Sequence, residues 1–208
     1  MKAVLLCTGL LAALPAGAGP STPATPVGDA VAFYKQKRYG EARSALERIV
    51  ASDPSNAAAC YFLAMTLQRA QPPSLDSARA RLDRAVHLAP ANEGYLAEYA
   101  GVTLLIAGRD SSFGLALEGR DAMARAVAMN PSDLDACDGL MRFCAQAPWP
   151  LGNPEKALDL AGRIAGRDPR RGREAYRTVA AILDASGRTK QALAARQAAE
   201  RLAQQGAR

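Results

Sequence analysis

The chain has 208 residues and carries 26 Lys and Arg against 20 Asp and Glu, which gives a net charge of +6. Only 5% of the residues are aromatic and no alternating pattern of β-branched residues stands out, so composition disfavours a sheet protein. His87 is the single histidine, which excludes every Ser-His-Asp, Cys-His or multi-histidine metal arrangement that does not use it.

The first 18 residues are expected to be an export signal. Lys2 supplies a positive start, residues 3–14 form an apolar stretch, and Ala16-Gly17-Ala18 offers small residues to a signal peptidase. The apolar stretch is shorter than the ~20 residues of a membrane span, although retention as an anchor stays open. We therefore expect cleavage near Ala18 and a bacterial-type protein that is periplasmic or secreted.

Residues 19–26 are expected to form a leader rich in Pro and Thr. Its three prolines lack amide donors and restrict their neighbours, so the segment PSTPATP is unsuited to a regular helix. From residue 27 to residue 205 the apolar residues follow a helical period, and no second apolar run is long enough for a membrane span.

Four prolines set the register of an internal repeat, because each follows an apolar helical stretch: Pro54, Pro90, Pro131 and Pro169. Twelve residues before these prolines stand four small residues: Ala42, Ala78, Gly119 and Ala157. Eight residues before them stand Leu46, Leu82, Met123 and Ala161. The same amphipathic helix pattern therefore occurs four times. Ala192 starts a fifth copy that lacks the proline, as expected of a terminal capping helix.

Each of these helices is preceded by another helix with its own small position. The first one has Ala30 and the aromatic Phe33, and the next two have Ala64 and Ala100 in the place of Ala30. This order of small, aromatic, small, bulky and proline residues resembles the tetratricopeptide repeat (TPR), a helix pair of about 34 residues.

The resemblance implies an all-α fold, a right-handed α-α superhelix of about five helix pairs over residues 27–205. Small residues let paired helices approach closely, and neighbouring pairs stack because no pair buries its apolar face alone. The expected repeats are approximately residues 23–56, 57–92, 93–133, 134–171 and 173–205.

The middle repeats are longer than the TPR consensus. Successive prolines are 36, 41 and 38 residues apart, whereas the spacing from small residue to proline is constant. The extra residues are therefore expected in loops between the two helices of a pair, at one end of the solenoid, where binding loops often occur. The predicted loops are residues 71–74, 108–114 and 147–152.

The TPR resemblance also implies that first helices line a concave surface that binds a partner. Its usual groove positions project onto seven residues here: Tyr34, Tyr61, Met65, Gln68, Asp135, Asp138 and Arg142. This set favours a protein or peptide segment as partner. We expect a non-catalytic scaffold or adaptor without a cofactor or bound metal, of unknown partner and oligomeric state.

Several chemically suggestive residues have simpler structural interpretations. His87 is expected near a helix end, where a cation meets the helix dipole favourably, and Asp133, Asp135 and Asp138 are expected to open a helix rather than bind a metal. Nothing resembles a glycine-rich phosphate loop. The thiols are expected to be buried and structural, although a disulfide with Cys60 stays open: Cys60, Cys137 and Cys144.

The segment Ala147-Pro148-Trp149-Pro150-Leu151-Gly152 contains the only tryptophan. Its prolines stiffen the loop, so Trp149 is a candidate anchor for a ligand. The favoured interpretation is instead that the loop folds back and Trp149 packs over the fourth helix pair.

Positive charge is concentrated at the C-terminal end. Residues 163–208 carry 11 Lys and Arg against four Asp and Glu, whereas residues 1–162 carry 15 against 16. An alternative function is therefore an envelope-associated structural protein, held on an anionic polymer or membrane surface by this basic last repeat. Nucleic acid is not expected, because Tyr176 is the only aromatic there that could stack on a base.

Overall fold

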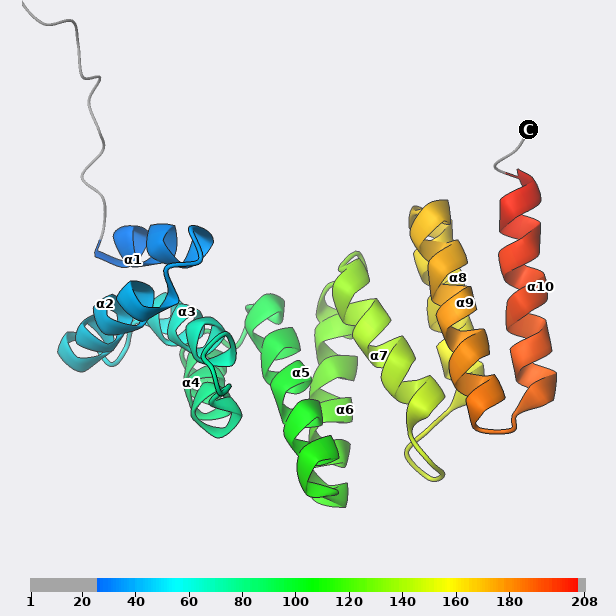
Figure 1. Cartoon of the computed structure of the whole chain (residues 1–208), viewed down its shortest axis with the longest axis horizontal. Coiled ribbons are helices and arrows are strands. Elements are labelled where there is room, and N and C mark those ends of the chain that lie inside the picture. The colour runs from blue at the N-terminus through cyan, green and yellow to red at the C-terminus, as the bar shows by residue number, and fades with distance from the viewer. Residues whose placement is uncertain (1–25, 206–208) are drawn as a thin grey trace, which may run out of the picture.

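The computed structural model describes residues 26–205, which form a row of α-helices (Figure 1). The predicted export signal and all but the last residue of the predicted leader lie outside them. The ten helices of the described part are α1 Pro26–Lys35, α2 Tyr39–Ser52, α3 Ala57–Gln68, α4 Leu75–Leu88, α5 Glu93–Asp110, α6 Phe113–Met129, α7 Leu134–Gln146, α8 Pro154–Arg167, α9 Pro169–Ala185 and α10 Thr189–Gln205. Helix α1 begins one residue earlier than predicted, with Pro26 in a first turn that tolerates proline.

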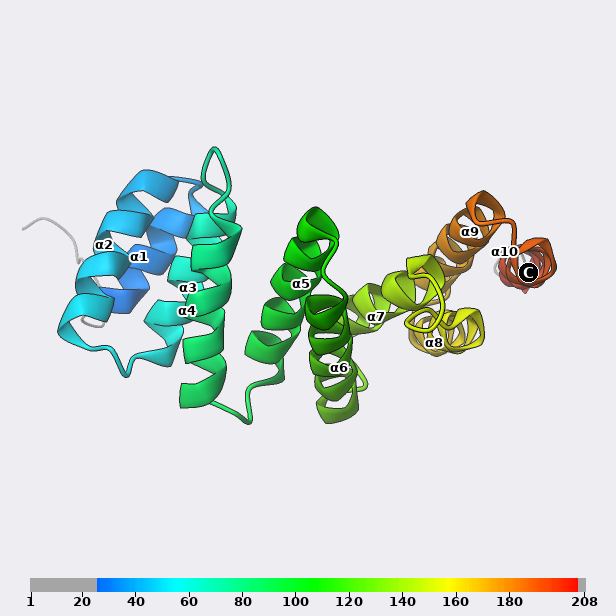
Figure 2. The ribbon, with the colours of Figure 1, turned by 90° about the horizontal axis from the view of Figure 1, so that it is seen from below.

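The helices form five successive pairs, which confirms the predicted all-α fold. The first helices α5, α7 and α9 lie on one side of the row, and the second helices α6 and α8 lie on the other side (Figure 2). All the alanines predicted at small positions are fully buried: Ala30, Ala42, Ala64, Ala78, Ala100, Ala157 and Ala192. Leu46 is also fully buried, Gly119 is buried and Phe33 is half-buried.

Gly119 shows why these positions are small. A Cβ atom built there would lie 2.8 Å from two side-chain carbon atoms of Leu104, so the backbones of α5 and α6 approach closely only without a side chain at this position.

Side-chain caps begin several helices, including the one that Asp133 was predicted to open. The Asn56 side chain accepts a hydrogen bond from the amide of Ala59, and Asn92 caps α5 in the same way. Asp133 accepts from the amides of Asp135 and Ala136, so this acidic residue opens α7. Three of the register prolines, Pro54, Pro90 and Pro131, are exposed in turns after a helix, whereas Pro169 is the first residue of α9.

The prediction of an extended loop at residues 108–114 is wrong. Residues Gly108 to Asp110 continue α5, and α6 starts at Phe113, so only Ser111 and Ser112 connect the two helices. Ser111 adopts a left-handed conformation with φ of 51°, and Ser112 caps α6 through Leu115. The additional residues lengthen the helices, because this segment contains no proline to stop them. The other two predicted loops do contain prolines and remain loops.

The apolar core consists of two clusters that meet at α5. The N-terminal cluster extends from α1 to Val102 and Ile106, and the C-terminal cluster extends from Leu96 and Ala100 to α10. The three cysteines of the described part are buried in these clusters and free, which confirms them as structural thiols: Cys60, Cys137 and Cys144.

A polar network joins the second helix pair to the third. The Arg79 guanidinium on α4 donates to the Glu118 carboxylate on α6 at 2.6 Å, to the Tyr99 hydroxyl at 2.9 Å and to the Thr103 hydroxyl at 3.2 Å. The Tyr99 hydroxyl also donates to Glu118. Arg79 thus connects three helices, and the ion pair of Arg109 on α5 with Asp76 on α4 is a second polar link between the same two helix pairs.

No helix within residues 26–205 combines the length and the hydropathy that crossing a membrane would require.

Candidate functional site

A chain of aromatic rings crosses the first helices of the first three pairs. The Tyr34 ring lies 6.1 Å from that of Phe62, and the Phe62 ring lies 5.1 Å from that of Tyr61. Tyr61 stacks on Tyr95 of α5 at 4.6 Å. All four rings are half-buried, so each presents part of its surface to solvent while being held by a neighbour. The predicted groove residues Tyr34 and Tyr61 therefore belong to one surface.

Tyr61 provides a test of this surface. Burial, assisted by the charge of Glu98, raises the pKa of Tyr61 to about 12, whereas an unfolded tyrosine titrates near ~10. The neutral ring is favoured in the folded state, so its contribution to stability is complete below pH ~10 and lost as the pH rises to about 12. We expect Tyr61→Phe to lose less stability than wild type over this range in urea unfolding. Equal losses of stability in wild type and Tyr61→Phe over this pH range would contradict the raised pKa of Tyr61.

Polar side chains follow the aromatic ones toward the centre of the row. The Gln68 amide lies 3.5 Å from the Met65 sulfur, and it is close enough to Glu98 of α5 to act on the pKa of that carboxyl. Burial raises the pKa of Glu98, Arg69 and Gln68 act against this rise, and the charges of Asp133 and Asp135 add to it. Glu98 thus lies beside Gln68, although the groove positions of the TPR consensus do not select it. The signal in the sequence is an acid within the apolar stretch of α5.

The predicted residues on α7 are engaged in ion pairs. The Arg142 guanidinium donates to the Asp138 carboxylate at 2.6 Å, one turn away on the same helix. Arg171 of α9 donates to Asp135 at 2.5 Å, which joins the fourth and fifth first helices. The seven predicted groove residues therefore form two groups, an aromatic and amide group on α1 and α3 and a charged group on α7.

A charged pocket of about 400 Å³ lies between α7 and α9. Asp138 and Arg142 line it from α7. Sequence analysis missed the residues that line it from α9, although the run RRGREAYR places arginines at helical spacing: Arg170, Arg171, Arg173, Glu174 and Arg177.

The prediction that Trp149 packs over the fourth pair is wrong, because its exposed fraction is 89%. The loop beneath it is nevertheless well held. The amide of Asn153 donates to the Cys144 carbonyl at 2.8 Å, and the Arg188 guanidinium donates to the carbonyl oxygens of Ala145 and Ala147. Leu151, at 8% exposure, is the apolar residue that anchors the loop. The loop therefore displays Trp149 rather than burying it.

Two substitutions test whether the Trp149 side chain is exposed or packs against the fourth helix pair. Trp149→Ala is expected to change the free energy of unfolding by less than ~0.5 kcal/mol, as at ordinary surface positions. Leu151→Ala in the same loop is expected to cost about 2–3 kcal/mol, because it empties a buried site. Urea unfolding of both variants measures this difference, and a large loss in Trp149→Ala would restore the packing interpretation.

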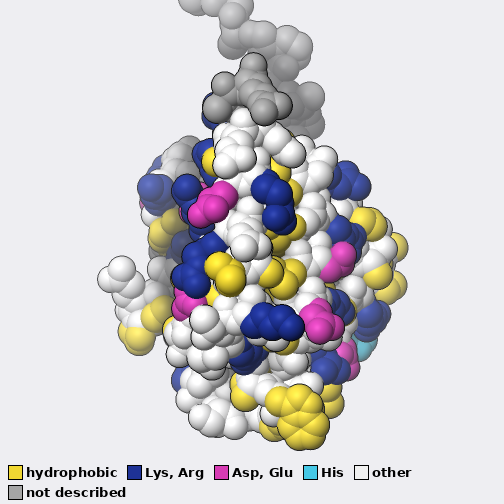
Figure 3. Space-filling model, turned by 90° about the vertical axis from the view of Figure 1, so that its right-hand side faces the viewer, with side chains coloured by type: hydrophobic (Ala, Val, Ile, Leu, Met, Phe, Trp, Pro, Cys, Tyr) yellow, Lys and Arg dark blue, Asp and Glu magenta, His cyan; other side chains and the backbone are white. Residues whose placement is uncertain are grey.

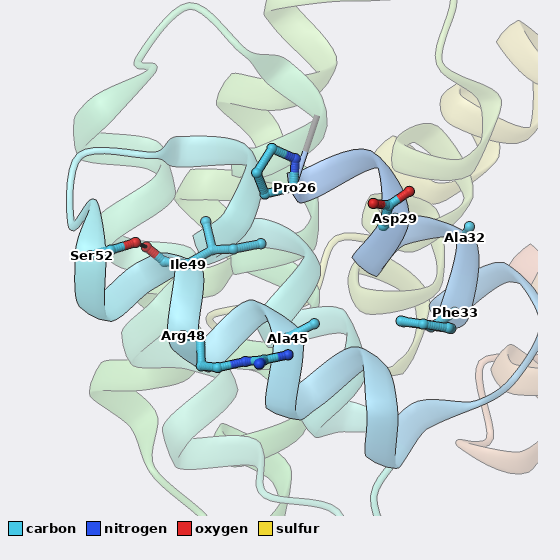
Figure 4. A pocket seen from close by; sticks show the side chains of 8 residues that line it. All are labelled: Pro26, Asp29, Ala32, Phe33, Ala45, Arg48, Ile49 and Ser52. Atoms are coloured by element: carbon cyan, nitrogen blue, oxygen red, sulfur yellow. Dashed lines mark hydrogen bonds between the residues drawn. The ribbon is translucent and has the colours of Figure 1, made fainter. Parts of the chain in front are cut away.

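Two further pockets have mainly apolar linings. One, of about 700 Å³, lies between the α5–α6 turn and the loop after α7, and its lining includes the exposed Phe113 and Leu105. The other, of about 600 Å³, lies between α1 and α2 at the N-terminal end of the row, with Phe33 and Ile49 beside Asp29 and Arg48 (Figure 4).

Groups suited to chemistry are scarce in the described part. Within residues 26–205, no group of three or more His, Cys, Asp and Glu side chains is placed to hold a metal ion. His87 lies in the last turn of α4, as predicted, and its ring contacts Asp83 of the same helix. Burial raises the pKa of the thiols of Cys60, Cys137 and Cys144, which disfavours the reactive thiolate.

Known structures match this fold, whereas no family model and no curated protein sequence matches the chain. MamA aligns with a TM-score of 0.69 at 17% identity, over 88% of this chain and 92% of MamA. YrrB, described as a TPR protein with an unusual peptide-binding site, aligns with a TM-score of 0.67 at 15% identity, over 85% of this chain and 84% of YrrB. A thermophilic TPR protein in Thermus thermophilus gives a TM-score of 0.59 at 21% identity, over 82% of this chain and 86% of that protein. At such identities the likeness concerns the fold, and the chain is a TPR-like helical solenoid.

Proposed function

We propose that this TPR-like chain is a non-catalytic adaptor that binds an extended segment of another protein along its first helices. The observation that carries the proposal is the series of exposed and partly exposed side chains on the first helices α1, α3, α5 and α7. It begins with stacked aromatic rings, passes through Gln68 and Glu98, and ends with the Asp138–Arg142 pair. Rings offer contact area at low entropic cost, and the polar groups beyond them set the position of a segment.

The comparison with YrrB supports the same proposal by analogy, because that TPR protein of similar fold has a peptide-binding site. The identity of the partner depends on the groove side chains, and 15% identity over the whole chain gives no basis for carrying the partner of YrrB over to this protein.

Site-directed crosslinking tests the proposal. A photoreactive residue is introduced at Gln68 or at Arg142, and as a control at Arg43, which forms the same kind of i,i+4 ion pair with Glu47 on the second helix α2. Mass spectrometry of crosslinks formed in an envelope fraction should find one protein at both inner positions and not at Arg43.

The identified segment is then synthesised and its affinity measured by fluorescence anisotropy. Tyr61→Ser together with Arg142→Ala should weaken binding by at least about tenfold, since each removed contact is worth ~1 kcal/mol or more at a well-packed site. Arg43→Ala should leave the affinity unchanged. Equal affinities of wild type, the double variant and Arg43→Ala for the segment would refute binding along the first helices.

Export is part of the proposal and rests on residues 1–18. The envelope fraction is the place to look for the partner if the signal is cleaved near Ala18. Mass spectrometry of the N-terminus of the protein recovered from the periplasm or medium tests this, and an intact N-terminus in the cytoplasm would reject it.

A second candidate function is attachment to an anionic envelope surface through the last helix pair. Its support is the basic surface seen from the C-terminal end of the row, where dark-blue Lys and Arg side chains cover more area than magenta Asp and Glu (Figure 3). Sedimentation with cell envelopes that is lost on adding salt would favour this function, whereas salt-insensitive capture of a peptide would favour the adaptor.

A further inference from the structure

The pocket between α7 and α9 contains arginines without partners. Arg170, Arg173 and Arg177 line it at i, i+3 and i+7 spacing, which places them along one face of α9. Within residues 26–205, none of these three side chains forms a hydrogen bond or an ion pair. In contrast, Arg142 and Arg171 at the same pocket are paired with Asp138 and Asp135.

The position of these arginines is electrostatically unfavourable. Helix α9 has no acidic residue in its first turn, where the amide ends carry partial positive charge, and Arg170, Arg171 and Arg173 stand in its first turns instead. Arginines three and four residues apart also repel one another. Asp168 caps this helix by accepting the amides of Arg170 and Arg171, and Glu174 is the one acidic side chain among the four arginines of residues 169–177. An anion in the pocket would offset the repulsion between the arginines.

We infer that this pocket binds the carboxylates of an acidic segment of a partner protein. The inference rests on the proposed function, because the segment held along the first helices would continue over α7 and α9. A guanidinium donates two parallel hydrogen bonds to a carboxylate, and a pocket of about 400 Å³ has room for few side chains.

The pocket composition favours a peptide over a lipid surface or a highly charged polymer. Asp138 and Glu174 line the same pocket, and their carboxylates can accept hydrogen bonds from the amides of a peptide, donors that the phosphates of a phosphatidylglycerol surface do not supply. The site is also recessed between two helices, which a flat membrane surface reaches poorly.

The test uses the full chain and a labelled peptide in which glutamates alternate with glycine and serine. Fluorescence anisotropy is measured for wild type, for Arg173→Gln with Arg177→Gln, and for the control Arg43→Gln with Arg48→Gln on α2. The pocket variant should lose at least about tenfold in affinity, and the control variant less than about twofold. The same peptide with glutamine in place of glutamate should not bind to any of them.

A second measurement separates a ligand site from a general charge effect. Without peptide, Arg173→Gln with Arg177→Gln should raise the melting temperature because it removes repulsion, whereas the control removes the Arg43–Glu47 pair and should not raise it. The peptide should then stabilise wild type but not the pocket variant.

Three results would overturn the inference. These are equal peptide affinity for the two double variants, binding of the glutamine peptide, and displacement of the labelled peptide by phosphatidylglycerol vesicles but not by excess unlabelled peptide. Failure of the pocket inference can be distinguished from failure of the adaptor proposal. If the glutamate peptide binds through the pocket and crosslinking finds no partner, the adaptor fails and the pocket stands. If crosslinking finds a segment without acids over α7 and α9, the adaptor stands and the pocket inference fails.

Discussion

Gly172→Ala is expected to lower the free energy of unfolding by about 2–3 kcal/mol, although alanine ordinarily favours a helix. Gly172 lies in α9 where that helix crosses the end of α8. A Cβ atom there would lie 2.2 Å from the Cα atom of Ala165 and 2.7 Å from its backbone nitrogen. Since the obstructing atoms belong to the backbone, α8 and α9 must move apart and lose contact along their length.

Gly166→Ala is the matched control. Gly166 also lies inside a helix, α8, but a Cβ atom there meets nothing within 4 Å. This substitution should stabilise the protein by about 0.5 kcal/mol, the benefit of alanine over glycine in a helix. Urea unfolding followed by circular dichroism measures both variants. A stabilising Gly172→Ala would mean that the two helices are not in the described contact.

Replacing either of two glutamates with glutamine should shift stability in opposite directions. Glu118 is held by Arg79 and Tyr99, and although burial opposes the effect, these hydrogen bonds lower its pKa. Glu118→Gln should therefore cost about 1 kcal/mol, a moderate value because both side chains of the pair are about a third or more exposed to screening solvent. Glu98 has a raised pKa because of burial, so Glu98→Gln should stabilise the protein at neutral pH.

The pH dependence of stability independently predicts the sign of the effect of each substitution. Glu118, with a lowered pKa, contributes stability that is present above its unfolded pKa and is lost as the pH falls through the folded one. Glu98, with a raised pKa, contributes stability below its unfolded pKa that is lost as the pH rises through the folded one. Both variants should therefore approach wild type below pH ~4. Urea midpoints at neutral and acidic pH provide the measurement, and equal signs for the two substitutions at pH ~7 would contradict this assignment.

The repeat register was predictable because it depends on local rules. A proline ends or begins a helix whatever surrounds it, and the buried small positions follow from the helical period. Hence Ala42, Ala78 and Ala157 were identified correctly from their spacing to a proline, and Asp133 from its place before a helix.

The errors arose where tertiary placement decides. Whether the residues around Ser111 form a loop or a tight turn depends on the left-handed conformation of one serine, which spacing does not reveal. Trp149 is exposed because its neighbour Leu151, and not the larger ring, occupies the apolar site. Glu98 and the arginines of α9 were missed because the groove positions of the TPR consensus do not include them. The burial of Glu98 and the packing of α9 against α7 depend on tertiary structure, which spacing does not reveal.

Helix α5 belongs to both apolar clusters, with Val102 and Ile106 in one and Leu96 and Ala100 in the other. Its packing therefore determines the angle between the two halves of the row. The aromatic rings lie mainly on one half and the unpaired arginines on the other, so this angle fixes how far apart the two kinds of anchor residue must be in the proposed partner segment. If the proposed adaptor function holds, replacing a buried residue of α5 is expected to alter the length of segment that the protein prefers without replacing any contacting side chain.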